Sequence, residues 1–409
     1  MRKVQVRVPG SKSHTHRALI CAALAEGESL IESPLLCQDT LYTLRALRAL
    51  GVRIGPSKRG IVVEGVGGRL KAPTDPIHLG NSGTSLRFLT AVCALVSGET
   101  ILTGSPRLLE RPIGPLVDAL GFWGVEVEDQ GGYPPVVVRG GRVLGGRTKV
   151  DCSISSQFLS GLLLLGPYAE SEAEIEAMGQ GVSGPYVDVT CEVMKAFGME
   201  VERRGCVLRV PKGVYRGSVF EVEPDPSSAT YPFLAGAITS KEVKVLGLRL
   251  RGKHPDLEFL SVLEQMGCRV RVEEDGVSLR GGELKGVEVD MSSMPDSVPS
   301  LAVAAAFARG ETVIKGVGHL RFKESDRIEV ISRSLEAMGI EVEVLPDGLR
   351  IYGGRPRACL IDPQGDHRIA MAFAIASLRV PGIVIKGPEC VRKSFPGFWK
   401  VLRAIKDDG

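Results

Sequence analysis

The stretch CAALAEGESLIES, residues 21–33, decides the fold because its shape recurs along the chain. An apolar helix end runs into a turn at Gly27, and a strand follows. The same shape returns in VCALVSGETILTG (92–104), LLLLGPYAESEAEIEAM (162–178), LAGAITSKEVKVLGL (234–248), VAAAFARGETVIKG (303–316) and AIASLRVPGIVIKG (374–387). The six turns fall at 27, 98, 170, 240, 310 and 381, so the steps are 71, 72, 70, 70 and 71 residues. This regular spacing indicates six copies of one structural unit.

A second set of segments shows what else each unit contains. Glycines at 51, 121, 198, 267 and 339 follow short apolar stretches, as in ALGVRI and AMGIEVEV. A glycine there is typical of the residue just after a helix, and the following sequence reads as a hairpin, as in VEEDGVSLRG. Each unit is therefore predicted to run helix–strand–helix–hairpin. Since the second set has only five copies, we expect the N-terminal strand KVQVRV (3–8) to complete the sixth unit.

Six units divide naturally into two similar lobes of three. The predicted fold class is α/β (α+β), with one lobe at 10–225 and the other at 1–9 plus 226–409. The chain is expected to cross between the lobes near 9–12 and near 223–227, where prolines disfavour helix. The alternative is one large irregular α/β domain.

The bulk composition narrows the class of protein. A chain of 409 residues is long enough for two or three domains, and 44% hydrophobic with 24% charged residues is typical of a globular protein. The net charge of +3 is too small to indicate a nucleic-acid or membrane surface by itself. Nine cysteines without a CxxC pair suit a reducing compartment, and no signal-like segment precedes the first strand. We therefore expect a cytoplasmic protein, and we take it to be a monomer.

A short polar motif precedes or opens each apolar helix. These motifs are SKS (11–13), NSGT (81–84), SSQ (155–157), DPSS (225–228), PDS (295–297) and DHR (366–368). Their hydroxyl, amide and carboxylate groups can cap helices. Capping does not explain the cations in or beside first turns, where the helix dipole disfavours them, namely Lys12, Arg17, Arg87, Lys323, Arg327 and Arg368. Helix N-termini with added cations form a site for phosphate and carboxylate groups.

Two carboxylates at predicted helix starts could supply acid–base chemistry. Asp296 follows a proline at one helix start, and Glu324 belongs to KESDR (323–327), which is expected to open another helix. That spacing places the Lys, Glu and Arg of the motif on one first turn, and Asp326 is interpreted as an N-cap. Two carboxylates in unlike surroundings can divide the roles of general base and general acid.

A series of short motifs, taken together, resembles a known family. The motifs are PGSKS (9–13) with Arg17, LGNSGT (79–84) with Arg87, ERPIG (110–114), SSQFL (155–159), Ser183 with PY (185–186), PD (295–296), KESDR (323–327), DHRIAM (366–371) and KSFP (393–396). Their order and identity resemble the EPSP synthase (3-phosphoshikimate 1-carboxyvinyltransferase) family. The resemblance implies the enolpyruvyl transferase fold, an inside-out α/β barrel of two lobes with a cleft between them. It also implies a transferase of the shikimate pathway of aromatic amino-acid (chorismate) biosynthesis, which moves the enolpyruvyl group of phosphoenolpyruvate to the 5-hydroxyl of shikimate 3-phosphate and releases phosphate.

The resemblance also implies roles for individual residues. Contacts to shikimate 3-phosphate are implied for Lys12, Ser13, Arg17, Ser155, Ser156, Gln157, Ser183, Asp296 and Lys323, which makes the lobe at 10–225 the shikimate 3-phosphate side. Contacts to phosphoenolpyruvate are implied for Lys12, Gly83, Arg111, Gln157, Arg327, Arg368 and Lys393, with the other lobe as its side. Glu324 is expected to move the methylene proton and Asp296 the hydroxyl proton, with Lys12 assisting. Neither a metal nor an organic cofactor is implied.

Two other functions stay open from the sequence. A sister enolpyruvyl transferase family acts on UDP-N-acetylglucosamine and has a reactive Cys before its RP motif, whereas residues 104–111 here contain none. An RNA-binding repeat scaffold is disfavoured because aromatic residues make up only 5% of the chain and the cations lie singly at helix starts. The expected partners are therefore small-molecule substrates, with neither nucleic acid nor a membrane.

Overall fold

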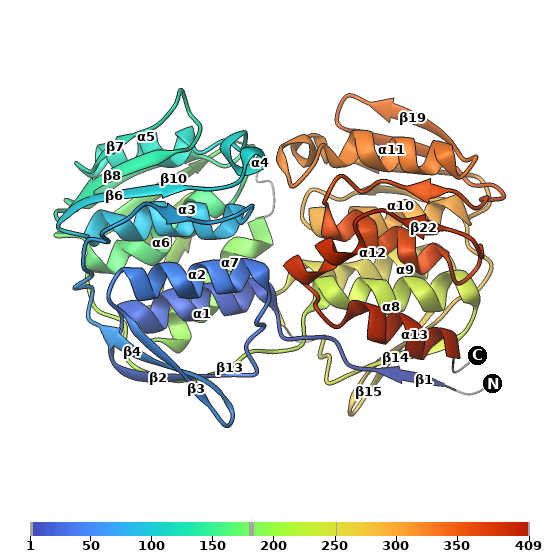
Figure 1. Cartoon of the computed structure of the whole chain (residues 1–409), viewed down its shortest axis with the longest axis horizontal. Helices are drawn as coiled ribbons and strands as arrows, with labels where there is room; N and C mark the ends of the chain where they lie inside the picture. The colour runs from blue at the N-terminus through green and yellow to red at the C-terminus, as the bar shows by residue number, and fades with distance from the viewer. Residues whose placement is uncertain (1–2, 180–183, 251, 408–409) are drawn as a thin grey trace. The chain divides into compact units, whose positions relative to one another are not determined.

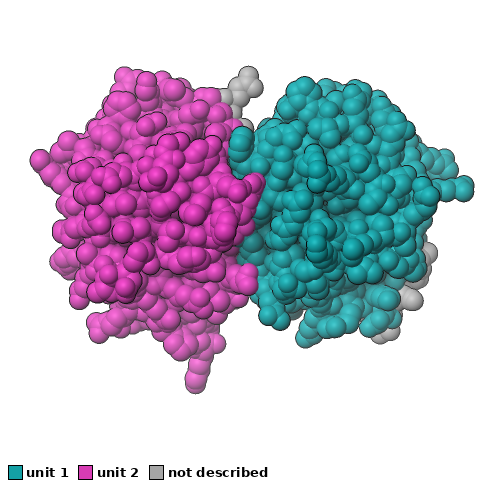
Figure 2. Space-filling view, turned by 45° about the horizontal axis from the view of Figure 1, so that its top comes forward, with its two compact units in different colours: residues 1–11, 223–409 teal, residues 12–222 magenta. Residues whose placement is uncertain are grey.

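The computed structural model describes residues 3–179, 184–250 and 252–407. The chain divides into two compact units, coloured separately in Figure 2. Unit 1 consists of Met1–Ser11 and Glu223–Gly409, and unit 2 consists of Lys12–Val222. The lobe expected at 10–225 differs from unit 2 by two residues at its start and three at its end.

Unit 2 contains three repeats. The first comprises α1 (Lys12–Leu24), β2 (Glu26–Glu32), α2 (Gln38–Ala49), β3 (Arg53–Ser57) and β4 (Gly60–Val66). The second comprises β5 (Ile77–His78), α3 (Gly83–Val92), η1 (Cys93–Leu95), β6 (Gly98–Thr103), α4 (Pro106–Leu109), α5 (Gly114–Phe122), β7 (Glu126–Glu128) and β8 (Val136–Gly140). The third comprises β9 (Gly146–Asp151), α6 (Gln157–Leu165), η2 (Gly166–Tyr168), β10 (Ala173–Met178), α7 (Gly184–Ala196), β11 (Glu202–Arg204) and β12 (Val207–Val210), and β13 (Val219–Glu221) follows.

Unit 1 contains the other three repeats and the N-terminal strand β1 (Val4–Val6). The fourth repeat comprises α8 (Pro226–Thr239), β14 (Glu242–Leu246), η3 (Pro255–Glu258), α9 (Phe259–Gln265), β15 (Arg269–Glu273) and β16 (Gly276–Arg280). The fifth comprises β17 (Glu288–Asp290), η4 (Pro295–Ser297), α10 (Val298–Ala306), β18 (Glu311–Lys315), η5 (Gly318–Phe322), α11 (Arg327–Ala337), β19 (Glu341–Leu345) and β20 (Gly348–Tyr352). The sixth comprises β21 (Leu360–Ile361), α12 (His367–Ala376), β22 (Val384–Ile385), η6 (Pro388–Lys393) and α13 (Phe398–Asp407).

The repeats form sheets with one common arrangement. The strand before the first helix of a repeat pairs in parallel with the strand after that helix, and the hairpin then adds two antiparallel strands. The resulting orders are β5-β6-β8-β7, β9-β10-β12-β11 and β17-β18-β20-β19. The sixth repeat contributes the two-stranded sheet β21-β22.

Two strands are exchanged where the chain passes from one unit to the other. β1 precedes α1 of unit 2, yet it pairs in parallel with β14 of unit 1, with Val4 opposite Val243 (Figure 1). β13 precedes α8 of unit 1, yet it pairs with β2 of unit 2, with Val219 opposite Leu30. The prediction that the N-terminal strand completes the sixth unit is therefore wrong, because the strand completes the fourth. Each strand at a crossing stays in the sheet of the unit that the chain is leaving.

Most of the glycines predicted to follow a helix adopt the left-handed conformation that ends one. Their φ angles lie between 78° and 105° at Gly51, Gly198, Gly267 and Gly339. The prediction for Gly121 is wrong because α5 continues to Phe122. Gly124, with a φ of 75°, follows that helix instead.

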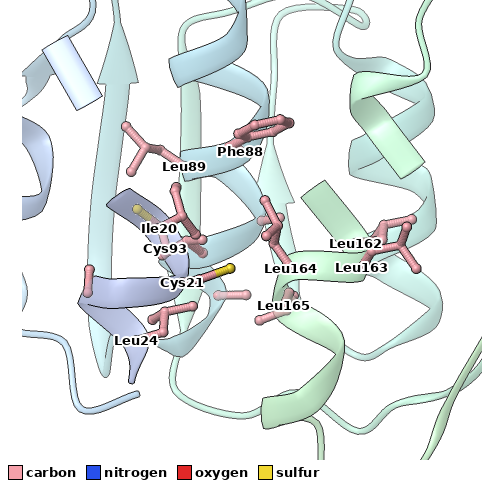
Figure 3. Packing of buried hydrophobic residues seen from close by; sticks show 14 of the residues in the cluster. Ile20, Cys21, Leu24, Phe88, Leu89, Cys93, Leu162, Leu163, Leu164 and Leu165 are labelled. Atoms are coloured by element: carbon pink, nitrogen blue, oxygen red, sulfur yellow. The ribbon is translucent and has the colours of Figure 1, made fainter. Parts of the chain in front are cut away.

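The first helix of each repeat is buried almost all round. In unit 2, the side chains of Ile20, Leu89 and Leu164 lie together between α1, α3 and α6 (Figure 3). Each such buried side chain contributes about 1.5–3 kcal/mol to folding. A helix that is apolar on every face can present polar groups only at its ends, which places functional side chains there. Among the described residues, no helix combines the length and apolar character needed to cross a membrane.

Candidate functional site

Unit 1 gathers three carboxylates around one buried guanidinium. The guanidinium belongs to Arg327, the first residue of α11, and its side chain is 1% exposed. It donates from Nε to Asp366 Oδ2 at 2.8 Å, from Nη1 to Asp296 Oδ1 at 2.9 Å and from Nη2 to Glu324 Oε2 at 2.8 Å. The arginine therefore fixes η4, the segment before α11 and the start of α12 relative to one another.

The electrostatic balance of this cluster depends on the carboxylates. Burial opposes the positive charge of Arg327, but Asp366, Glu324 and Asp296 together outweigh burial and raise the pKa of the guanidinium. The arginine therefore stays charged at every accessible pH. Removal of one partner from such a buried network leaves the others without compensation.

Two further cations complete the cluster. Arg368 Nη2 donates to Asp296 Oδ2 at 2.5 Å, and Lys393 Nζ lies 3.8 Å from Glu324 Oε1. Each of the two candidate acid–base carboxylates thus faces Arg327 and one additional cation. The six charged groups, three cations and three carboxylates, balance one another.

The helix start near KESDR differs from the prediction. Asp326 is the N-cap of α11, as predicted, and its side chain accepts from Glu329 N at 3.1 Å. Lys323 and Glu324 therefore precede the helix, and the prediction that they lie on its first turn is wrong. The reason is local, because Asp326 caps α11 and only Arg327 of the motif continues into the helix.

One member of this cluster and one histidine that senses its charges were not assigned a role from the sequence. Asp366 caps α12 by accepting from Arg368 N at 2.9 Å, and its other oxygen accepts from Arg327. His319 lies buried in η5, where burial lowers its pKa to about 3, assisted by the charges of Lys323 and Arg327. Asp366 belongs to the polar motif DHR (366–368), whereas no pattern in the sequence singles out His319.

In unit 2 the first residue of α1 forms an ion pair with α2. Lys12 Nζ donates to Asp39 Oδ2 at 3.0 Å, and the Asp39 side chain is 3% exposed. Asp39 stands in the first turn of α2, and no sequence motif drew attention to it. The ammonium of Lys12 is therefore held by a carboxylate of the same repeat.

Arg87 of α3 orients the glutamine that begins α6. Arg87 Nη1 donates to Gln157 Oε1 at 2.9 Å, and Gln157 Nε2 donates to Thr84 Oγ1 at 3.0 Å. Arg87 Nη1 also reaches Ser155 Oγ at 3.4 Å, and the Phe158 ring lies 5.0 Å from the guanidinium carbon. These bonds fix which way the amide of Gln157 points. Arg87 thus has a structural reason to lie at a helix start.

Arg17 makes its contacts within unit 2. Nε donates to Thr190 Oγ1 at 2.7 Å, Nη1 donates to the Ser13 carbonyl at 2.9 Å and Nη2 donates to the Tyr186 carbonyl at 3.1 Å. Burial among these uncharged partners lowers the pKa of Arg17 to about 10. The side chain joins α1 to α7, and its predicted contact with a substrate phosphate stays a prediction.

Arg111 lies against the glycine that opens α3. A Cβ placed on Gly83 would lie 2.5 Å from Arg111 Cζ, so a side chain at 83 cannot coexist with the guanidinium in its present position. Arg111 Nη1 also reaches the Asn81 carbonyl at 3.4 Å. A guanidinium beside the free N–H groups of a helix start is a favourable arrangement for an anion.

The predicted site residues fall into two groups, one in each unit. Unit 1 holds Asp296, Lys323, Glu324, Arg327, Arg368 and Lys393, whereas unit 2 holds Lys12, Ser13, Arg17, Gly83, Arg111, Ser155, Ser156 and Gln157. Ser183 lies outside the described residues. Within the described ranges, no group of three or more His, Cys, Asp or Glu side chains is arranged to hold a metal ion.

Comparison with known proteins places this chain among relatives of nearly equal length. The family model of EPSP synthase (3-phosphoshikimate 1-carboxyvinyltransferase) matches residues 3–402. The 3-phosphoshikimate 1-carboxyvinyltransferase of Methanoculleus marisnigri is 47% identical over 400 residues, which cover 96% of this chain and 94% of the relative. The protein of the same name from Thermococcus kodakarensis is 44% identical over 407 residues, with coverages of 98% and 97%.

Solved structures agree with this assignment. The EPSP synthase from Acinetobacter baumannii matches with a TM-score of 0.81 and 32% identity, covering 98% of this chain and 95% of that one. The enolpyruvyl transferase NikO from Streptomyces tendae matches with a TM-score of 0.78 and coverages of 99% and 94%, but at 20% identity it shows the fold alone. The predicted mixed α/β fold of enolpyruvyl transferases is confirmed by these neighbours. With a family model that covers almost the whole sequence, this chain belongs to the EPSP synthase (3-phosphoshikimate 1-carboxyvinyltransferase) family of transferases.

Proposed function

We propose that the chain transfers the enolpyruvyl group of phosphoenolpyruvate to the 5-hydroxyl of shikimate 3-phosphate, with release of phosphate, in chorismate biosynthesis. Membership of the family supports the proposal. The structural observation that supports it best is the arginine-centred cluster, in which Asp296 and Glu324 share Arg327. The reaction needs two proton-transferring groups close together among cations, and this cluster has that composition.

The chemistry requires each proton transfer twice. In the addition step, the hydroxyl oxygen bonds to C2 of phosphoenolpyruvate, the hydroxyl loses its proton and the methylene carbon gains one. In the elimination step, the new methyl group returns a proton to the acid's conjugate base, the C–O bond to phosphate breaks, and the departing phosphate takes the proton that the base had accepted from the hydroxyl. An acid for the carbon and a base for the oxygen must therefore work side by side.

We assign the methylene proton to Glu324 and the hydroxyl proton to Asp296, with Lys12 assisting. Both oxygens of Asp296 are hydrogen-bonded, Oδ1 to Arg327 and Oδ2 to Arg368. An anionic substrate group that binds Arg368 competes with Asp296 for that guanidinium. Arrival of the substrate would in this way free Oδ2 of Asp296 to accept the hydroxyl proton.

The remaining residues supply anion binding. We assign phosphoenolpyruvate to Lys12, Gly83, Arg111, Gln157, Arg327, Arg368 and Lys393. We assign shikimate 3-phosphate to Lys12, Ser13, Arg17, Ser155, Ser156, Gln157, Ser183, Asp296 and Lys323. Support within unit 2 comes from Arg111 beside the start of α3 and from the fixed amide of Gln157. No metal or organic cofactor takes part in the proposed reaction.

The proposal is tested by the choice of acceptor. The purified protein is incubated with phosphoenolpyruvate and either shikimate 3-phosphate or UDP-N-acetylglucosamine, and phosphate release and product mass are measured. Release only with shikimate 3-phosphate is expected. Release only with the nucleotide sugar, or salt-dependent RNA retention without any release, would reject the proposal. Sedimentation of the same sample tests the expected monomer.

A further inference from the structure

The outward face of one sheet in unit 1 carries a pocket that the proposed reaction does not use. It has a volume of about 80 Å³ and is lined by Glu242, Arg269, Arg271, Ser278 and Arg280, which we call the arginine pocket. These residues come from β14, β15 and β16, whose order in the sheet is β14-β16-β15. Arg269 stands opposite Arg280, and Arg271 stands opposite Ser278. Because side chains alternate along a strand, the intervening valine and leucine face the core and the arginines face away from it.

The same strand has the opposite charge in two other repeats. β15 begins Arg269-Val270-Arg271, whereas β7 reads Glu-Val-Glu at 126–128 and β19 begins Glu-Val-Glu at 341–343. The alternation of polar and apolar residues is the same in all three strands, so only the sign of the charge changes. In the second repeat, the glutamates pair with Arg139 of β8, at 3.0 Å for Glu126 and 2.6 Å for Glu128.

The charge reversal leaves the arginine pocket unbalanced. Arg280 holds the position of Arg139, but its cross-strand neighbours are Glu242 and Arg269 instead of two glutamates. Glu242, a carboxylate that lines the pocket, also lies 3.3 Å from Lys3 Nζ. Among the described residues, neither Arg269 nor Arg271 takes part in an ion pair. The lining of the pocket therefore holds three arginines and one carboxylate, and two of the arginines have no ion-pair partner among the described residues.

Two simpler explanations do not account for this pattern. β15 is the edge strand of its sheet, and charge on an edge strand prevents pairing with other chains. The glutamates of β7 and β19 serve that purpose equally well, so protection of the edge does not require arginine. The arginines also do not serve to balance surplus carboxylates on this face of the sheet. Glu273, at the other end of the face, is already paired with Lys244 at 2.7 Å.

We propose that the arginine pocket binds a phosphate group, either inorganic phosphate or a phosphate ester. A guanidinium group presents parallel donors that match phosphate oxygens, and Arg retains its charge at any physiological pH. Three such groups around a cavity large enough for one small anion form a cage for a dianion. The site shares no residue with the Arg327 cluster and lies on a sheet face, not at a helix start.

The test uses the full chain and inorganic phosphate at constant ionic strength, with chloride as the balancing anion. Arg269→Glu introduces the glutamate found at this position in the second and fifth repeats, Glu126 and Glu341, and should retain the fold. Titration calorimetry of the unchanged protein should show one more phosphate-binding event than the variant, or binding at least tenfold tighter at one site. Arg355→Glu changes the net charge equally at an exposed loop position and should behave like the unchanged protein.

Two further readouts make the result decisive. The thermal midpoint of Arg269→Glu in chloride should equal or exceed that of the unchanged protein, because one Arg–Arg contact is replaced by a Glu–Arg contact. Turnover and KM for the enolpyruvyl transfer should not change. Equal phosphate titrations for the unchanged protein and Arg269→Glu would overturn the proposal. A parallel titration with glycerol phosphate shows whether the pocket prefers a phosphate ester or inorganic phosphate. Tighter binding of either one supports the site.

Discussion

Arg327 and Asp296 are joined by a hydrogen bond of 2.9 Å from Nη1 to Oδ1, although 31 residues separate them in the chain. The bond connects the start of α11 to η4 and leaves only one oxygen of Asp296 for Arg368. One guanidinium therefore sets both the geometry and the charge around the two candidate proton-transferring groups. The first two predictions follow from this relationship.

Removal of either carboxylate charge should slow the reaction. We expect Asp296→Asn and Glu324→Gln each to lower turnover by roughly 10²–10⁴, the usual contribution of an acid–base group. Steady-state phosphate release measures the effect, and the thermal midpoint shows whether the fold is retained. Near-normal turnover in both variants would remove the assigned proton-transfer roles.

Arg327 should matter for stability as well as for catalysis. Arg327→Met leaves three carboxylates without their shared cation, and loss of one partner of a buried ion pair costs about 3–5 kcal/mol. Arg333→Met on the same helix is the control, because the Arg333 side chain is 65% exposed and, among the described residues, its ion pair is with Glu329. That surface pair should contribute at most about 0.5 kcal/mol. Urea unfolding of both variants measures the difference, and equal losses would contradict the role of the buried network.

A methyl group at position 83 should weaken phosphoenolpyruvate binding. Gly83→Ala places a Cβ 2.5 Å from Arg111 Cζ, so the guanidinium must move. We expect a higher KM for phosphoenolpyruvate with a smaller change in turnover. Gly121→Ala is the matched control, since its Cβ meets nothing within 4 Å and a helical Gly-to-Ala change tends to stabilise. An unchanged KM in Gly83→Ala would show that the position of Arg111 does not matter.

Arg368 should act mainly through binding. Arg368→Ala removes a charged hydrogen-bond donor, for which a loss of roughly 10- to 100-fold in affinity for phosphoenolpyruvate is expected. Equilibrium titration of the protein with phosphoenolpyruvate in the presence of shikimate 3-phosphate measures the dissociation constant. Arg355→Ala, at an exposed loop position, controls for the change in net charge. An affinity equal to that of the control would exclude a direct contact.

The buried histidine of η5 should make the protein sensitive to mild acid. The pKa of His319 is about 3 in the folded chain against an ordinary 6.5, because of burial and the nearby Lys323 and Arg327, with Asp296 acting in the opposite direction. As the pH falls from 6.5 towards 3, the unfolded chain binds a proton that the folded chain does not. The free energy of unfolding should therefore fall by up to about 1.4 kcal/mol per pH unit in this window.

Substitution of the histidine provides the check. His319→Gln should flatten the dependence of the urea midpoint on pH between 6.5 and 5, where carboxylates titrate little. Identical pH profiles for the variant and the unchanged protein would show that His319 does not carry this effect.

The sequence predicted what is encoded locally. The repeat, its helix ends and the caps at Asp326 and Asp366 follow from spacing and residue type. The partner of β1 could not be predicted, because KVQVRV has the same alternation as other strands and pairs with residues more than 200 positions away. The same limit applies to Asp39, whose importance depends on tertiary packing against Lys12.

The cations at helix starts show a different limit. Arg17 and Arg87 appear in the same pattern as Arg368, yet their guanidinium groups bond to hydroxyl, amide and carbonyl groups within unit 2. Arg368 instead donates to the carboxylate of Asp296. The sequence pattern does not distinguish an arginine with uncharged partners from one that is paired with a carboxylate.

The exchange of β1 and β13 also determines the order in which a nascent chain can complete its sheets. β1 leaves the ribosome early, but Val6 meets its partner only when Val245 has been added, 239 residues later. At about 5–20 residues per second, that delay lasts roughly 12–48 s. Unit 2 has all its strands once Glu221 is made, so it can fold while β1 is still an unpaired strand. The polar residues Lys3, Gln5 and Arg7 alternate with the valines of that edge, which reduces mispairing during the delay.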